Sequence, residues 1–249
     1  MTVTEKWLTI GLLCLSGSAI FWLPLFSDIF YIPMQNAFGF TKTQMGILLS
    51  TFGAVSLLAY FPGGWLADRF LPRKLITIAL VVTAIAGFVF STLPSFEICL
   101  ILFSIWGICS AGILWSAMIK AARCWGKRED QGKTYGILEG GRSISDVVST
   151  TILLAIFAYS SSVDKAVSEI IIMISFYTLV LAFLVWRIMN DDISKTEERP
   201  KVTINEIIYI LKLPVIWLIA LIILATNTAM WGTLFFTPYA TEVYELGEV

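Results

Sequence analysis

Seven blocks of about twenty mostly apolar residues divide this sequence, and the stretches between them hold nearly all of its charged side chains. A helix needs about twenty residues, at about 1.5 Å each, to cross the hydrocarbon layer of a bilayer. The blocks lack the alternation of polar and apolar residues that membrane barrel strands require. The sequence therefore predicts an all-α, polytopic membrane protein with spans at Trp7–Phe30, Gln44–Leu66, Leu75–Leu93, Glu97–Ile119, Tyr135–Ala158, Ser168–Trp186 and Pro214–Phe236.

Composition excludes several other classes of protein. Of the 249 residues, 57% are hydrophobic and only 14% are charged, and the mean hydropathy is +0.83, far above that of a water-soluble domain. The net charge of −1 offers no concentrated basic surface for nucleic acid. The chain has no histidine, and its four cysteines lack metal-ligand spacing, so we expect no enzyme activity, no cofactor and no metal site.

Basic residues in the breaks between spans predict how the chain is oriented. Of the 17 Lys and Arg residues, only Lys42 and Lys165 lie in the odd-numbered breaks. Lys and Arg favour the cytoplasmic side of a membrane. We therefore expect a multi-pass protein of the plasma membrane, or bacterial inner membrane, with a cytoplasmic N-terminus. The basic residues on the predicted cytoplasmic side are Lys6, Arg69, Arg73, Lys74, Lys120, Arg123, Lys127, Arg128, Lys133, Arg187, Lys195, Arg199, Lys201 and Lys212.

A long polar connection between the sixth and seventh spans predicts a domain boundary. It begins with the composition of a solvated linker. Its second part, Thr203–Leu211, has apolar residues at helical spacing, which fits either a short amphipathic helix at the membrane surface or an early start of the seventh span. The seventh span echoes the first, with Trp231 aligned to Trp22, as in a parallel-repeated second half that the sequence enters but does not complete. The predicted domains are 1–189, 190–212 and 213–249.

The break between the second and third spans reads GGWLADRFLPRK, from Gly63 to Lys74. This loop resembles the signature G-x-x-x-D-R-x-G-R-R/K of the major facilitator superfamily. Leu71 stands where the family usually has glycine, so the turn must be made differently. The resemblance implies two six-helix bundles that rock about a central cavity, of which this sequence holds the N-terminal six-helix bundle and the seventh transmembrane helix. The matching positions are Gly64, Asp68, Arg69 and Arg73 or Lys74.

The chemistry of this loop predicts a conformational latch. Its two glycines let a neighbouring helix approach closely, as small residues do in membranes. Asp68 lies where a carboxylate meets helix ends, so it could accept hydrogen bonds from a helix N-terminus or pair with Arg123 at the end of the fourth span. The alternative is that the basic residues of the loop only fix the topology against anionic lipid. The predicted gating residues are Gly64, Asp68, Arg69, Arg73, Lys74 and Arg123.

Three charged residues inside the fifth span, Glu139, Arg142 and Asp146, lie three and four residues apart and therefore share one helix face. A central charge costs roughly 2.5 to 3.5 kcal/mol in a bilayer, so we expect these residues to face the bundle interior or a wet cavity and to pair with one another. In one interpretation, Arg142 holds an anionic or hydroxyl-rich solute while Asp146 or Glu139 carries a coupling proton. In the other, a closed ion-pair network holds the span against a neighbour.

Other residues within the spans are further candidates for a solute or coupling site. Asp28 ends the first span near the outer face, where a role in outer gating competes with plain solvation. Asn227 and Trp231 interrupt the seventh span, which lines the cavity in the family that the loop resembles, although Asn227 could equally bond a neighbouring helix. Among the aromatic residues, we expect Trp22 and Trp106 to lie deep enough to stack on a sugar-like solute.

Together these features predict a secondary active transporter, either a symporter or an antiporter, that moves a small polar organic solute such as a sugar, sugar phosphate or organic acid by alternating access. The phosphate-binding loop G-x-x-x-x-G-K-[ST] does not occur in the sequence. The expected partners are the solute, a coupling proton or counter-solute and the lipid bilayer. Two alternatives stay open, a seven-helix receptor or sensor and a non-transporting, truncated remnant of the family.

Overall fold

The computed structural model describes residues 3–126, 128–159, 162–190, 209 and 212–232, and within them every regular element is a helix, which confirms the predicted all-α class. The chain divides into two compact units, Met1–Thr196 and Glu197–Val249. Within the described residues, six segments are long and apolar enough to cross a membrane: Thr4–Phe38, Lys42–Arg69, Pro72–Phe90, Phe96–Trp125, Gln131–Ala158 and Lys165–Ile188. All but the first differ from the predicted spans by only a few residues.

The first of these segments is not the single helix that the sequence predicted for Trp7–Phe30. A turn separates α1 (Val3–Trp22) from α2 (Ser27–Phe38). Pro24 lies in this turn, and because it has no N–H to donate to the carbonyl of Ile20, the helix is interrupted there. The segment also continues past the predicted end, as far as the last residue of α2.

The signature loop is a two-residue connection between α3 (Lys42–Arg69) and α4 (Pro72–Phe90). Phe70 is extended, and so is Leu71, whose φ of −70° and ψ of 132° suit any residue. Pro72 then occupies the first turn of α4, where its missing N–H is not needed. The turn requires no left-handed residue, which explains how leucine replaces the glycine usual in the signature.

The fourth segment changes helix type along its length. α5 (Phe96–Gly107) passes into a π-helical stretch, η1 (Ile108–Trp115), and then into α6 (Ser116–Trp125). The wider π-helical turns are rare and occur frequently at functional sites. α3 packs directly on η1, because a Cβ added to Gly63 would overlap the backbone of Gly112. This close backbone contact fixes the position of η1 in the bundle.

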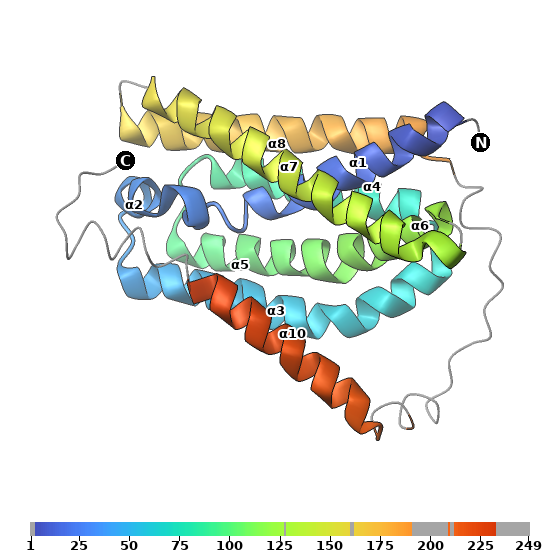
Figure 1. Ribbon diagram of the computed structural model, residues 1–249. Coiled ribbons are helices and arrows are strands. Elements are labelled where there is room, and N and C mark those ends of the chain that lie inside the picture. The colour runs from blue at the N-terminus through green and yellow to red at the C-terminus, as the bar shows by residue number, and fades with distance from the viewer. Residues whose placement is uncertain (1–2, 127, 160–161, 191–208, 210–211, 233–249) are drawn as a thin grey trace. The chain divides into compact units, whose positions relative to one another are not determined.

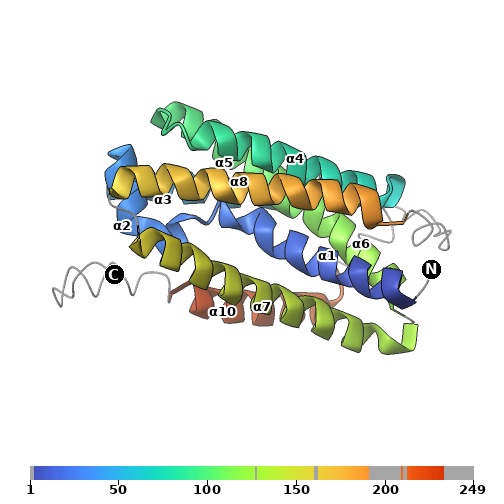
Figure 2. The same cartoon turned by 90° about the horizontal axis from the view of Figure 1, so that it is seen from above.

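The first unit ends with two long helices, α7 (Gln131–Ala158) and α8 (Val163–Ile188), and a short 3-10 turn at Arg128–Asp130 precedes α7. Figures 1 and 2 show α8 beside α4 and α7 beside α1. On the outer side of α7, Ile144 and Val147 are 67% and 68% exposed. α7 is therefore held through one narrow face, whose buried residues are Thr134, Leu138, Ser145 and Leu153.

The core of the first unit consists of two apolar clusters of buried side chains. One cluster contains Leu138 of α7, and the other contains Leu153 of the same helix. Phe21, Trp22 and Ile105 are partly buried and pack against both clusters. These three residues therefore mark the level at which the two clusters meet, part-way along the bundle.

The described part of the second unit includes α10 (Pro214–Gly232). The predicted seventh span, Pro214–Phe236, is described as far as Gly232, and its hydroxyl side chains bond to their own helix, with Thr226 Oγ1 donating to the carbonyl of Ile222 over 2.6 Å. Apart from Tyr209, the predicted amphipathic helix Thr203–Leu211 lies outside the described residues, as does most of the predicted linker 190–212.

Candidate functional site

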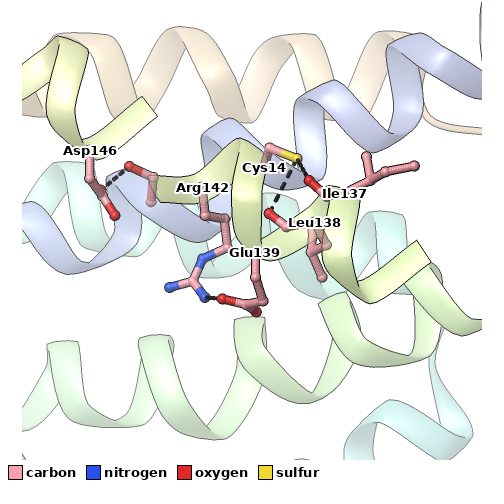
Figure 3. Close-up of polar contacts among 7 residues, drawn as sticks. Cys14, Ile137, Leu138, Glu139, Arg142 and Asp146 are labelled. Carbon is pink, nitrogen blue, oxygen red and sulfur yellow. Dashed lines mark hydrogen bonds and ion pairs between the residues drawn. The ribbon is translucent and has the colours of Figure 1, made fainter. Parts of the chain in front are cut away.

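Two of the three charged residues predicted to share a face of α7 form an ion pair. Arg142 Nη1 donates to a carboxylate oxygen of Glu139 over 2.7 Å, and Figure 3 shows the two side chains pointing toward one another. The Arg142 side chain is 15% exposed, whereas the Glu139 side chain is 52% exposed. The arginine is therefore the fixed, inner member of the pair, and the glutamate is its outer, more accessible partner.

Aromatic rings from two other helices surround the Arg142 guanidinium. Its central carbon lies 4.8 Å from the ring centre of Trp115 at the end of η1 and 6.0 Å from that of Phe21 on α1. The stem of the arginine runs past Gly17, where an added Cβ would lie 3.0 Å from both Cδ and Nε of Arg142. Cation–π contacts stabilise a cation by about 0.5 to 1 kcal/mol at exposed sites and by about 2 kcal/mol or more when it is desolvated, so the rings help to hold the charge inside the bundle.

Asp146 does not pair with Arg142 but bonds to α1. Trp22 Nε1 donates to Asp146 Oδ1 over 3.0 Å, and the hydroxyl of Ser18 donates to the same oxygen. In Figure 3 no dashed line joins the Asp146 and Arg142 side chains. Trp22 is itself stacked on Tyr177 of α8, with ring centres 5.3 Å apart. The closed three-residue network is thus only partly formed, since Asp146 is joined to a different helix.

α1 and α7 also contact each other through small residues on the N-terminal side of these charges, and we call this contact the seam. The thiol of Cys14 lies 3.6 Å from the carbonyl oxygen of Leu138, and a Cβ added to Gly141 would lie 2.5 Å from that sulfur. Small residues let membrane helices approach so closely that their backbones come near one another. The seam sets the depth of Arg142 and Asp146, because it fixes the register of α7 on α1.

The polar cluster of Glu139, Arg142 and Asp146 lies at the level where the two apolar clusters meet. Phe21, which contacts Arg142, and Trp22, which bonds to Asp146, both pack against the two apolar clusters. Three buried polar atoms near it in sequence have no hydrogen-bond partner among the described residues, namely Arg142 Nε, Ser145 Oγ and Ser16 Oγ. Each such buried group costs about 1 to 3 kcal/mol. A site of this kind is not a saturated structural network, and it can gain bonds when a ligand binds or the helices move.

Four further residues predicted for the site do not contact these charges among the described side chains. Asp28 lies in the first turn of α2, where a carboxylate favours the helix N-terminus, and no side-chain bond joins it to α7 in the described part of the chain. Trp106 is fully buried and donates to the carbonyl of Thr83, so it is a core residue that no solute reaches. The side chains of Asn227 and Trp231 lie outside the described residues, although their backbone belongs to α10.

The predicted latch residues lie at one end of the bundle. Asp68 is exposed and makes no hydrogen bond or ion pair to any described residue, so it does not pair with Arg123 in this conformation. Gly64 is exposed, and a Cβ added there would meet nothing within 4 Å. Lys120, and not Asp68, joins α6 to the end of α3, since its Nζ donates to the carbonyl of Ala67 over 2.6 Å.

The basic residues of the same loop stack on aromatic rings. The guanidinium of Arg69 lies 4.0 Å from the ring centre of Trp65, and that of Arg73 lies 4.8 Å from the ring centre of Trp186 at the end of α8. Lys74 is exposed. Trp125 Nε1 also donates to the carbonyl of Lys6, near the N-terminus. Together with the contacts of Lys120 and Arg73, this bond brings Lys6 and the second, fourth and sixth breaks to one end of the unit.

Several residues of the site carry no signal that sequence reasoning had used. Gly17, Ser18 and Trp115 contact the charged residues of α7 only because α1 and η1 pack beside it. A serine and a glycine at successive positions of an otherwise apolar span is the one available hint, since small and polar residues gather at helix contacts. Among the described residues, no group of three Cys, Asp or Glu side chains is placed to hold a metal ion.

Comparisons with known proteins agree with this architecture. The family model described as Major Facilitator Superfamily matches residues 8–249. The chain is 29% identical over 250 residues to the inner membrane protein YqcE of Escherichia coli (strain K12), covering 98% of the chain and 59% of that protein. It is 28% identical over 255 residues to the inner membrane protein YihN of the same organism, covering 99% of the chain and 60% of that protein.

A solved structure shares the fold. The inward-facing, unoccupied crystal structure of a bacterial homologue of the human lysosomal transporter Spinster matches with a TM-score of 0.76 at 15% sequence identity. The match covers 99% of this chain and 58% of that one. The chain therefore spans about three fifths of the length of these relatives.

Proposed function

This chain belongs to the major facilitator superfamily, and from that premise we propose that it carries a small polar organic solute, such as a sugar, a sugar phosphate or an organic acid, across the inner membrane by alternating access. Family membership favours a transporter, with no enzyme activity of its own, over the seven-helix receptor considered from the sequence. The relatives are inner membrane proteins, and we propose the same location here, with the N-terminus and the basic end of the bundle in the cytoplasm.

The observation that carries this proposal is the inward placement of two charged residues of α7, Arg142 and Asp146. The side chains of Arg142 and Asp146 lie on the side of α7 that faces the bundle. Arg142 contacts Trp115 of η1, and Asp146 accepts a hydrogen bond from Trp22 of α1. Charges within a membrane span are expensive, and those that face the interior of a bundle mark solute or ion pathways by default. In transporters of this kind the solute and the coupling ion bind near the middle of the bilayer. The level at which the two apolar clusters meet supports such a position.

The residues of the cluster have different proposed roles. Arg142 binds the solute, because it is the one cation of the group and its Nε has no partner among the described residues. Asp146 carries the coupling proton, because its bonds to Ser18 and Trp22 join the state of its carboxylate to the position of α1. Glu139 is the alternative proton carrier. Asp28, Asn227 and Trp231 remain proposed contributors to the pathway, beyond the described contacts.

The signature loop is the proposed cytoplasmic gate. Asp68 is exposed and unpaired among the described residues, so it is available to pair with Arg123 or a helix N-terminus in another conformation of the transport cycle. Lys120 and the stacked guanidinium groups stabilise the loop in the present conformation. The remaining proposed gating residues are Gly64, Arg69, Arg73 and Lys74.

Solute counterflow tests this function. The protein as it is encoded, in full, is reconstituted into vesicles loaded with an unlabelled sugar, sugar phosphate or organic acid, and entry of the labelled compound is followed. We expect saturable counterflow of at least one compound and its loss in Arg142→Gln, with Glu169→Gln, an exposed carboxylate on α8, as the control. A compound that binds the purified protein but shows no counterflow would contradict the proposal.

A further inference from the structure

We infer that the solute carries an oxyanion group, a carboxylate, sulfonate or phosphate, and that Glu139 competes with this group for Arg142. The inference rests on the proposed transport function and narrows it to one chemical class of solute. Arginine is the residue best suited to bind such groups, because its planar N–H fork matches the spacing of their oxygens.

The surroundings of Arg142 select the direction from which a ligand binds. Trp115 and Phe21 contribute rings to the guanidinium from η1 and α1, at 4.8 Å and 6.0 Å from its central carbon. An aromatic ring is not a carboxylate or carbonyl acceptor, so a guanidinium held over such rings can still donate its N–H groups, which lie in its own plane, to a ligand. A ligand therefore approaches in the plane of the N–H groups, as a carboxylate does. A neutral sugar hydroxyl satisfies one such donor at a time and gains no charge-assisted bond.

Glu139 already shows the geometry that an oxyanion would adopt. Its carboxylate oxygen lies 2.7 Å from Arg142 Nη1, a distance typical of a charge-assisted hydrogen bond. The pair differs from a structural ion pair in one respect, because Glu139 is 52% exposed while Arg142 is 15% exposed. The glutamate has room to move away from the pair, and the arginine, which lies against the rings and α1, stays in place.

The other carboxylate of the cluster does not take the same position. Asp146 accepts hydrogen bonds from Trp22 and Ser18, and no bond joins it to Arg142 (Figure 3). Glu139 is thus the only carboxylate bonded to Arg142 among the described residues. When an anionic solute binds, Glu139 loses its cation, so exchange of one carboxylate for another is the step that the solute drives.

Thermal unfolding of the purified, full-length protein in detergent tests the inference. Three anions are compared with neutral compounds of similar skeleton: D-gluconate and D-glucose 6-phosphate with D-glucose, and methanesulfonate with dimethyl sulfone. A ligand that binds the native state raises the unfolding temperature according to its concentration and Kd. We expect at least one anion to raise it more than its neutral counterpart, and Arg142→Gln to abolish the difference.

The variant Glu139→Gln separates two models. If the ion pair only stabilises the site, removing Glu139 should raise the Kd for the anion. If Glu139 competes with the anion, removing it should lower that Kd. A partly exposed ion pair contributes roughly 0.2 to 1 kcal/mol, so removing the competitor should lower the Kd for the anion about 1.4- to 5-fold. Glu169→Gln, an exposed carboxylate on α8 with no bond to Arg142, should leave the Kd unchanged. Weaker anion binding in Glu139→Gln, or equal binding of anion and neutral compound, would overturn the inference.

Counterflow separates this inference from the proposed function. If a neutral solute is carried and Arg142→Gln carries it equally well, the oxyanion class is wrong while transport stands. If an anion binds through Arg142 but is not carried, the oxyanion site stands and the transport function is wrong.

Discussion

The indole Nε1 of Trp22 donates a 3.0 Å hydrogen bond to the Asp146 carboxylate, so the last residue of α1 is joined to the middle of α7. Directly beyond Trp22 the first segment is interrupted at Pro24 and turns into α2. Asp146 is therefore hydrogen-bonded to the residue that directly precedes the turn between α1 and α2. This arrangement places a carboxylate of the proposed coupling site next to the turn between α1 and α2.

Replacing Trp22 by Phe tests that relationship. Phenylalanine can keep the stacking on Tyr177 but removes the N–H donor to Asp146. We expect slower solute uptake in Trp22→Phe than in the wild type, and a double variant Trp22→Phe/Asp146→Asn no slower than Asp146→Asn alone, because both changes break the same bond. Initial uptake rates of the four proteins form the cycle. Fully additive effects of the two substitutions would show that Trp22 acts independently of Asp146.

Gly17 should tolerate a side chain poorly, because Met118 and Arg142 would have to move to admit it. A Cβ there would lie 2.5 Å from the sulfur of Met118 and 3.0 Å from Arg142. We expect Gly17→Ala to lose about 1 to 3 kcal/mol of stability through overpacking. Gly11→Ala, on the same helix, meets nothing within 4 Å and should be neutral or gain up to about 1 kcal/mol from its helix propensity. Unfolding by SDS in mixed micelles measures both, and equal stabilities would contradict the packing described.

Substitution by alanine should affect stability strongly at one of the two neighbouring glycines near the end of α3 and hardly at the other. A Cβ on Gly63 would overlap the backbone of Gly112, which can yield only if α3 and η1 separate, so Gly63→Ala should cost about 3 kcal/mol or more. Gly64→Ala meets nothing within 4 Å and should leave stability within about 0.5 kcal/mol of the wild type. A loss of uptake in a stable Gly64→Ala would support a gating role for this position. Comparable destabilisation by both would mean that the wrong glycine has been placed at the contact.

Lys120 should contribute to stability although it forms no ion pair in the described structure. Its ammonium donates to the carbonyl of Ala67 over 2.6 Å and to that of Phe70 over 3.4 Å, where the C-terminus of α3 has free carbonyls. We expect Lys120→Gln to cost about 1 to 2 kcal/mol. Lys133→Gln removes only an exposed pair with Asp130 and should cost less than about 0.5 kcal/mol. Detergent unfolding compares the two, and an unaffected Lys120→Gln would remove the cap from the account.

Much of the fold follows from local properties of the sequence. Apolar runs long enough to span a bilayer predict the helices, and the spacing of Glu139 and Arg142 predicts their ion pair, which lies within one turn. The interruption at Pro24 was missed because the residues around it are apolar and hide the break from a hydropathy argument. The signature loop was located correctly, although its turn is extended rather than glycine-dependent.

The partners of the site across helices could not be predicted in the same way. Asp146 meets Trp22 through the packing of two helices far apart in the chain, and nothing local indicates which donor will face it. Trp115 ends the π-helical stretch, whose wider turns change the direction in which side chains point, so regular helical spacing does not predict its contact with Arg142. Likewise, only the position of Gly112 decides that Gly63, and not Gly64, makes the close contact.

Proton-driven uptake by Asp146→Asn in reconstituted vesicles is the most direct test that the α7 cluster binds the solute and couples its movement. An inward proton gradient should accelerate accumulation by the wild type, while Asp146→Asn should retain solute exchange but no longer respond to the gradient, because asparagine cannot take up the proton. If Asp146→Asn accumulates solute with the same gradient and pH dependence as the wild type, Asp146 is not the coupling residue and this account of the site is contradicted.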